Sequence, residues 1–365
     1  MRMHRLMLAL WCLITATTVL AEDVQYTFRP GDSLWRVCEN FARDPNQCWK
    51  ELAQYNGISS PRAIPPGAIL NIPTEWLKQA PEPARVHAVI GEVMLYRKQG
   101  GQAERATQGI EVNAGDALET GDNSSVRVLF ADQSELLVKP ESLVIFDRYS
   151  RFQETGMVDT NLRLERGELR TYVRPRTSGS SRFIIVTPSA VAAVRGTRFD
   201  VEVDQEEVTR NSVLDGAVAL SAQGKTQQVD AGFASMAAPG EPPSEPVPLL
   251  PATTATAAVE WPQATVTWAS VEGAERYWVE LFNQADGSLL RSEPIELQQW
   301  QASLEAGEYA LVVRAVDEAG IRGFEATTTF SLVRPAPVVV EPEAAKKDLR
   351  GLWIFLVGAA LLLGL

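Results

Sequence analysis

The chain has 365 residues, of which 45% are hydrophobic and 22% charged, a composition typical of globular proteins and unlike that of disordered chains. It carries 34 basic and 46 acidic residues, a net charge of −12, without a basic block. This excludes most nucleic-acid binders, which neutralise phosphates with Lys and Arg. Its only histidines are His4 and His87, so we expect no histidine-based catalytic triad and no metal site.

Residues 1–21 are typical of a secretory signal peptide, with Arg2 and Arg5 followed by an apolar run and compact residues before Glu22. The remaining chain holds 32 basic and 46 acidic residues, a net charge of −14. An uncleaved N-terminal anchor is the alternative. In either case we expect the rest of the chain to be exported.

A small β-α-α-β unit is predicted over residues 23–75. Residues 24–28 alternate like a strand, and Ser33 can cap a helix that ends near Phe41. Asn46 can cap a second helix, which Asn56-Gly57 stops, and residues 68–72 form a last strand. A unit of about 50 residues has a marginal core, so it needs additional stabilisation.

Cys38 and Cys48 are separated by nine residues, and an exported pair at this spacing is a good disulfide candidate. Closing so short a loop adds about 2–3 kcal/mol in the chain-entropy model. Two buried thiols are the alternative. A zinc site needs more ligands than lie nearby.

Two further blocks, 85–238 and 259–334, consist almost entirely of predicted strands. Short alternating runs recur between glycine-containing turns, which predicts an all-β sandwich, barrel or solenoid. Proline-rich linkers are predicted near 73–83, at 239–258 and at 335–348, and we expect them to be extended and solvated, with Trp76 and Leu77 packing back on the first unit. The whole is therefore a multidomain, mainly β chain.

Residues 349–365 are predicted to form a C-terminal apolar helix that anchors the chain in a membrane. Residues 351–365 carry no charge but span only about 22 Å as a helix, against a hydrocarbon core of about 30 Å, so Arg350 must snorkel. The basic residues Lys346, Lys347 and Arg350 conflict with the positive-inside bias. A processed sorting tail is the alternative, and an inner-membrane location is favoured for an uncleaved helix.

The first unit resembles a LysM domain. The resemblance is carried by Tyr26-Thr27-Phe28, by Gly31-Asp32-Ser33-Leu34-Trp35, by Asn56-Gly57 and by the run from Ile64 to Pro73. LysM domains bind glycans that contain N-acetylglucosamine, chiefly peptidoglycan. The resemblance implies a shallow glycan groove with one wall of Gly31, Asp32, Ser33 and Leu34 and another of Asn56, Gly57, Ile58 and Ser59. Cys38 departs from the family, which usually has a small apolar residue there.

These residue types suit an N-acetyl sugar. Glycine lets the backbone come close to a ligand, Asp32 and Ser33 supply polar atoms, and Leu34 and Ile58 supply apolar contact. The alternative is structural, because Gly31 and Asp32 can serve only the turn and Ser33 only the helix cap.

The second block resembles a FecR-type domain, most clearly in the run from Val186-Thr187-Pro188 to Val194-Arg195-Gly196-Thr197-Arg198-Phe199. In the namesake regulators this domain relays a periplasmic signal, but we expect no such relay here because no cytoplasmic sigma-binding domain precedes the block. Arg195 and Arg198 can bind a partner carboxylate, although internal pairing is favoured.

The third block resembles a fibronectin type III-like sandwich. Val266-Thr267-Trp268 suits an early strand, Tyr277 to Leu281 a central strand, and Leu304 to Asp317 a late hairpin with a corner tyrosine. Sugar stacking by the tryptophans of this block is possible, but core packing is favoured for most of them.

Together these features predict a non-enzymatic, peptidoglycan-binding protein of the bacterial periplasm, with no catalytic residues, no cofactor and no metal. It would tether β-rich interaction domains between cell wall and membrane. One alternative is a sensor or scaffold that binds an envelope protein through the FecR-type domain. Another is a glycan-cleaving enzyme, because carboxylates are plentiful, although no phosphate loop or Gly-x-Ser-x-Gly elbow is present.

Overall fold

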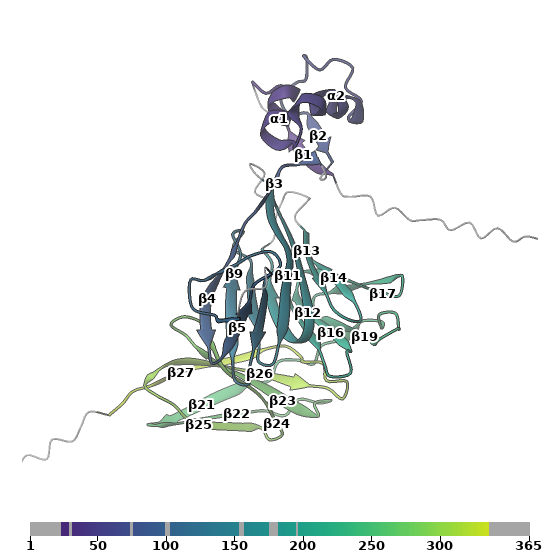
Figure 1. Cartoon of the computed structure of the whole chain (residues 1–365). Helices are drawn as coiled ribbons and strands as arrows, with labels where there is room; N and C mark the ends of the chain where they lie inside the picture. The colour runs from purple at the N-terminus through teal and green to yellow at the C-terminus, as the bar shows by residue number, and fades with distance from the viewer. Residues whose placement is uncertain are drawn as a thin grey trace, which may run out of the picture.

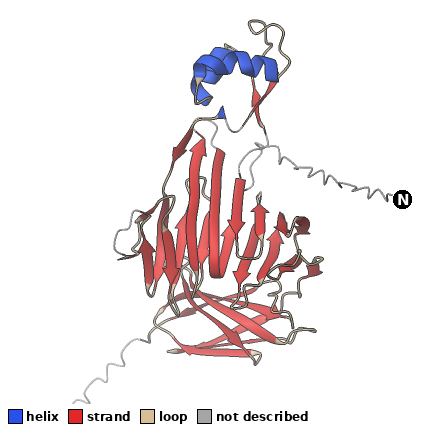
Figure 2. Cartoon of the chain, turned by 45° about the vertical axis from the view of Figure 1, so that its right-hand side comes forward, coloured by secondary structure: helices blue, strands red, loops and turns tan. Residues whose placement is uncertain are grey.

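The computed structural model describes residues 23–28, 31–73, 76–98, 103–152, 157–174, 182–194 and 196–335. The predicted signal peptide, the predicted anchor at 349–365 and Arg195 lie outside the described residues. Three bodies follow one another: a small lobe with both helices, a large body of two sheets and a sandwich across its far end (Figures 1 and 2). Within the described part, no helix combines the length and the apolar character needed to cross a membrane.

The small lobe has the predicted β-α-α-β order. It consists of β1 (Val24–Thr27), α1 (Leu34–Phe41), α2 (Pro45–Tyr55) and β2 (Ile69–Ile72), and the two strands pair antiparallel. Ser33 caps α1 as expected, but Asp44, not Asn46, caps α2: its carboxylate accepts the Asn46 N–H at 3.1 Å. The helix begins earlier because Pro45 occupies its first position, where a missing N–H costs nothing.

A disulfide and a compact core hold the lobe together. Cys38 of α1 and Cys48 of α2 form a disulfide, as predicted from their spacing in an exported chain. Helix α1 buries Leu34, Val37, Cys38 and Phe41 on one face, consistent with its amphipathic pattern. Leu77 is only 1% exposed in the same cluster, so the segment after β2 packs back on the lobe as expected.

The large body is a pair of sheets packed on one core. The first sheet contains, in hydrogen-bonded order, β6 (Glu104–Arg105), β5 (Val93–Tyr96), β8 (Ala117–Thr120), β11 (Leu143–Phe152, also paired with β3, Gln79–Pro81), β12 (Met157–Tyr172), β13 (Arg182–Val186), β14 (Val191–Val194), β17 (Ala217–Ala222) and β18 (Lys225–Asp230). The second contains β7 (Glu111–Val112), β4 (Ala84–Ile90), β9 (Ser125–Leu129), β10 (Glu135–Val138), β12, β15 (Arg198–Val203), β16 (Thr209–Asp215), β19 (Phe233–Ala237) and β20 (Val247–Pro248).

Strand β12 belongs to both sheets and joins them. Its first part pairs with β11, and from Gly167 onward it pairs with β15. Gly167 has φ +86°, and a Cβ there would lie 2.2 Å from the Ser142 hydroxyl oxygen, so only glycine fits this corner. Between the sheets lie alternate side chains of the strands, among them Val128, Phe146 and Phe199.

The third body is a sandwich of two antiparallel sheets. One contains β21 (Ala255–Glu260), β22 (Gln263–Trp268) and β25 (Gln299–Ser303), and the other contains β24 (Leu289–Ile295), β23 (Arg276–Asn283), β26 (Gly307–Val316) and β27 (Ala326–Leu332). The Tyr309 hydroxyl donates to the Glu305 carbonyl at 3.0 Å, the corner arrangement expected in this architecture. Trp268 and Trp300 are buried in its core, which confirms core packing for both.

The linker predicted at 239–258 was expected to be extended and solvated, but the structure shows that part of it is packed against the β bodies. Val247 and Pro248 form β20, and Leu249 is 7% exposed in a small apolar cluster with Ala234 and Ile321. The Leu250 carbonyl accepts the Phe324 N–H at 2.9 Å. Apolar residues among the prolines thus anchor the segment between the two β bodies.

Candidate functional site

The two predicted glycan-binding loops are anchored at neighbouring positions of the β1–β2 strand pair. The loop 31–34 precedes α1, and its Asp32 bonds to Tyr26 of β1. The loop 56–59 follows α2, and its Asn56 bonds to Asn71 of β2. Because Tyr26 pairs with Leu70, the residue before Asn71, the structure brings the two anchors together.

The first loop is held in place by its own side chains. The Asp32 carboxylate accepts from the Tyr26 hydroxyl at 2.6 Å, and the Gly31 carbonyl accepts from the Arg36 guanidinium at 3.3 Å. The Ser33 hydroxyl accepts a hydrogen bond from the Arg36 backbone N–H at 3.2 Å, and Ser33 itself is exposed. The expected apolar contact from Leu34 is wrong for its side chain, which is 2% exposed because α1 points it into the core.

The second loop contains one structural clamp and one open position. The Asn56 amide donates to the Leu52 and Asn71 carbonyls and accepts the Asn71 N–H at 2.7 Å, so its side chain ties α2 to β2. Gly57 has φ +64°, as a helix C-terminus requires. Ile58 is half-buried against the core, whereas Ser59 is exposed.

Trp35 extends this surface and was not among the predicted contacts. It follows Leu34 on the first turn of α1 and its ring is 45% exposed. An aromatic ring beside backbone donors and small polar groups can contact the apolar face of a sugar. The signal in the sequence was an aromatic residue on the polar side of an amphipathic helix.

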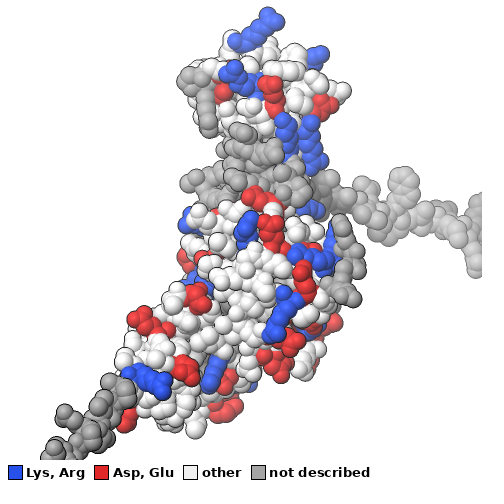
Figure 3. Space-filling model, turned by 60° about the vertical axis from the view of Figure 1, so that its left-hand side comes forward, with Lys and Arg blue, Asp and Glu red and all other residues white. Residues whose placement is uncertain are grey.

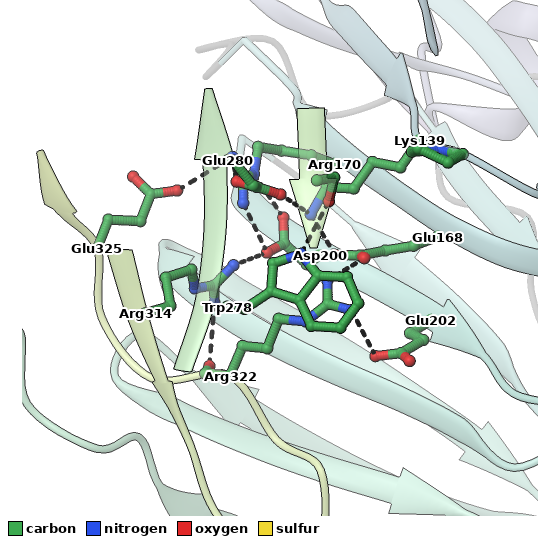
Figure 4. Close-up of polar contacts among 12 residues, drawn as sticks. Lys139, Glu168, Arg170, Asp200, Glu202, Trp278, Glu280, Arg314, Arg322 and Glu325 are labelled. Carbon is green, nitrogen blue, oxygen red and sulfur yellow. Dashed lines mark hydrogen bonds and ion pairs between the residues drawn. The ribbon is translucent and has the colours of Figure 1, made fainter. Parts of the chain in front are cut away.

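A second cluster lies between the large body and the sandwich. Strand alternation directs Glu168, Arg170 and Asp200 away from the core of the large body, and Glu280 and Arg314 away from that of the sandwich. These outward positions face each other across the domain boundary, so charges that a lone domain would expose are buried here (Figure 4).

The contacts of this ionic joint are extensive. Arg170 pairs with Asp200 at 3.0 Å and with Glu280 at 2.8 Å, and Lys139 bridges Glu280 and Glu168. We define the ionic joint as Lys139, Glu168, Arg170, Arg198, Asp200 and Glu202 of the large body with Glu280, Arg314, Arg322 and Glu325 of the sandwich. Five basic and five acidic groups balance in this set.

Burial and charge compete in setting the pKa values within the joint. Burial raises the pKa of Glu280, but Arg170 and Lys139 outweigh it and lower that pKa from 4.5 to about 2. Burial likewise opposes ionisation of Asp200, yet Arg170 and Arg314 hold its pKa well below 3.8. The carboxylates therefore remain ionised because their cationic partners are fixed beside them.

Arg198 pairs within the chain, but not across a strand turn as expected. It contacts Glu325, which belongs to the sandwich. The Arg322 guanidinium lies 3.8 Å from the Trp278 ring centroid, which covers it. Sequence reasoning missed the joint, but its signal was present: Glu280 and Arg314 interrupt otherwise apolar strands.

The face of the molecule drawn in Figure 3 carries charges of both signs. On the face in Figure 3, acidic and basic side chains are interspersed over the β bodies without a continuous basic area. His87 is exposed on β4, apart from both clusters. The arrangement suits ligand binding at the lobe and domain docking at the joint.

Family models match two stretches of the chain. Residues 26–73 match the family model of the LysM domain, and residues 116–219 match that of the FecR protein. A curated relative from Deinococcus radiodurans, an uncharacterized protein, is 45% identical over 51 residues. That match covers 14% of this chain and only 20% of the relative's length.

Solved structures show low overall similarity. A proposed anti-sigma factor from Parabacteroides distasonis has a TM-score of 0.30 and 16% identity, covering 35% of this chain and 59% of that one. A two-domain fibronectin type III segment of chicken tenascin has a TM-score of 0.22 and 13% identity, covering 46% of this chain and 94% of that one.

Proposed function

We propose that this chain, which carries a LysM domain and a FecR domain, is a non-enzymatic peptidoglycan-binding protein of the bacterial periplasm. The observation that supports the proposal is the anchoring of loops 31–34 and 56–59 at neighbouring positions of the β1–β2 pair, in a disulfide-linked lobe whose sequence matches the LysM family. Residues 349–365 would hold the other end of the chain in a membrane, favoured to be the inner one.

Glycan contact is assigned to exposed parts of the two loops. Gly31 and Gly57 would present backbone groups, Ser33 and Ser59 hydroxyls, and Ile58 an apolar edge. Asp32 and Asn56 would act mainly by holding the loops, because each already makes a hydrogen bond inside the lobe. Leu34 would contribute only through its backbone.

Tethering follows from two weak attachments on one chain. Binding of the lobe to the cell wall and of the C-terminal segment to a membrane raises the effective concentration of each second contact. The two β bodies, docked through the ionic joint, would then be presented as one unit between wall and membrane.

The test is sedimentation of the full chain, purified in detergent, with isolated peptidoglycan sacculi. Ser59→Glu should weaken binding at least tenfold, because it places a carboxylate and extra bulk on an exposed loop position. Asn40→Glu is the matched control: it makes the same kind of change on an exposed residue at the far end of α1 and should bind as the parent does.

Two results would overturn the proposal. Failure of the parent chain to sediment would remove the glycan-binding function. Release of soluble glycan fragments would favour the cleaving enzyme. If the parent binds but Ser59→Glu and Asn40→Glu behave alike, the assignment of the two loops is wrong.

A further inference from the structure

A pocket opens at the boundary between the large body and the sandwich. Its volume is about 280 Å³, room for one or two amino-acid residues. Strands β9, β10, β12 and β15 form one side, and β23, β26 and β27 form the other. Ligand sites are common at such domain interfaces.

Five charged residues from both domains line the pocket. They are three arginines, Arg127, Arg170 and Arg198, and two glutamates, Glu135 and Glu325. The excess of one positive charge lies in a chain of net charge −12, so it is not a reflection of overall composition.

The Arg127 guanidinium has one N–H group that a ligand could accept a hydrogen bond from. Its two terminal nitrogens donate to Glu135 and to the Gly287 carbonyl, but its Nε–H is buried and has no hydrogen-bond partner among the residues that the structure describes. A buried donor of this kind is costly unless a ligand or water accepts from it. Arg198 pairs with Glu325 and keeps 43% of its side chain exposed.

Apolar residues from both domains also line the pocket. They are Leu137, Phe282 and Val312, and the ring-bearing Tyr172, 43% exposed, is part of the same lining. A ligand that fills the pocket must therefore combine a hydrophobic group with an anionic one. Arginine binds carboxylates with two parallel hydrogen bonds, which makes a carboxylate the natural anion.

We propose that this interdomain pocket binds the free carboxyl terminus of a peptide whose last side chain is apolar. The carboxylate would lie against Arg127 and Arg198, and the terminal side chain against Phe282 and Val312. The site requires both domains, so neither the FecR domain nor the sandwich would bind alone.

The test is calorimetric titration of the full chain in detergent with N-acetyl-glycyl-phenylalanine and with its C-terminal amide. The free acid should bind at least tenfold more tightly than the amide. Arg198→Gln should abolish this difference. Arg163→Gln is the control, because it changes an exposed, paired arginine on the first sheet and should preserve the difference.

A second variant, which blocks the pocket sterically, distinguishes loss of binding from loss of folding. Thr327 is an exposed lining residue, and Thr327→Trp would fill the pocket without removing a charge. It should eliminate binding of both peptides while leaving the thermal transition unchanged. Equal binding of acid and amide, no binding of either peptide, or full binding by Thr327→Trp would overturn the proposal, whatever the outcome with sacculi.

Discussion

Replacing Glu280 with glutamine tests whether the ionic joint stabilises the docked β bodies. The substitution keeps the shape of a side chain that is 1% exposed but removes its charge. Arg170 and Lys139 then lose a shared anionic partner inside the interface. Removing one member of a buried ion pair is far more damaging than replacing the whole pair by apolar groups.

The size of the effect follows from the pKa of Glu280. A fall from 4.5 to about 2 corresponds to about 3 kcal/mol of stabilisation of the ionised form by the folded protein. This agrees with the roughly 3–5 kcal/mol lost when a buried pair is broken. We therefore expect Glu280→Gln to lower the free energy of unfolding by about 3 kcal/mol.

Asp147→Asn is the matched control for urea unfolding followed by circular dichroism. It makes the same acid-to-amide change in a pair with Arg163, at 2.8 and 3.0 Å, whose side chains are 34% and 43% exposed. Exposed pairs contribute about 0–1 kcal/mol, so the control should be nearly neutral. Equal losses in the two variants would refute the argument that the joint is energetically distinct.

Two further predictions concern acid and reduction. Because the folded-state pKa of Glu280 is depressed, its stabilisation is complete above its usual pKa and is lost as pH falls from about 4.5 towards 2. Thermal unfolding across this range should show the melting temperature falling less steeply in Glu280→Gln than in the parent, and parallel curves would contradict this expectation. Replacing Cys38 and Cys48 together by alanine should destabilise the lobe by about 2–3 kcal/mol. Amide hydrogen exchange should then show an earlier loss of protection in α1 and α2 but not in β12. Unchanged protection of the two helices would show that the disulfide is dispensable.

The strand periodicity predicted the β bodies well, because alternation records which side chains face a core. Alternation continues through residues 86–96, but the structure has two strands there, β4 and β5, divided at Gly91. Residues 162–164 and 169–172 look like separate runs but belong to one strand, β12. Alternation continues through the Gly167 corner, so it does not reveal that the strand changes sheets there.

The candidate sites were harder to predict than the fold. The LysM resemblance indicated two candidate glycan loops, which stay a prediction, but it did not reveal that Leu34 faces the core or that Asn56 is a clamp, since both depend on how helix and strand pack. The joint depends on contacts between two domains, made by residues that are more than 100 positions apart in the sequence, such as Arg314 and Asp200. A charge within an apolar strand indicates a buried partner without identifying it.

The joint also determines where the polypeptide can be divided for experiment. A fragment ending at residue 238 would retain Lys139, Glu168 and Asp200 but lose the sandwich side chains that neutralise and cover them. Such a fragment would expose charged side chains that are buried in the intact chain. Binding of another molecule to those side chains would be an artefact of the truncation. Fragments that span 76–335 keep that surface covered.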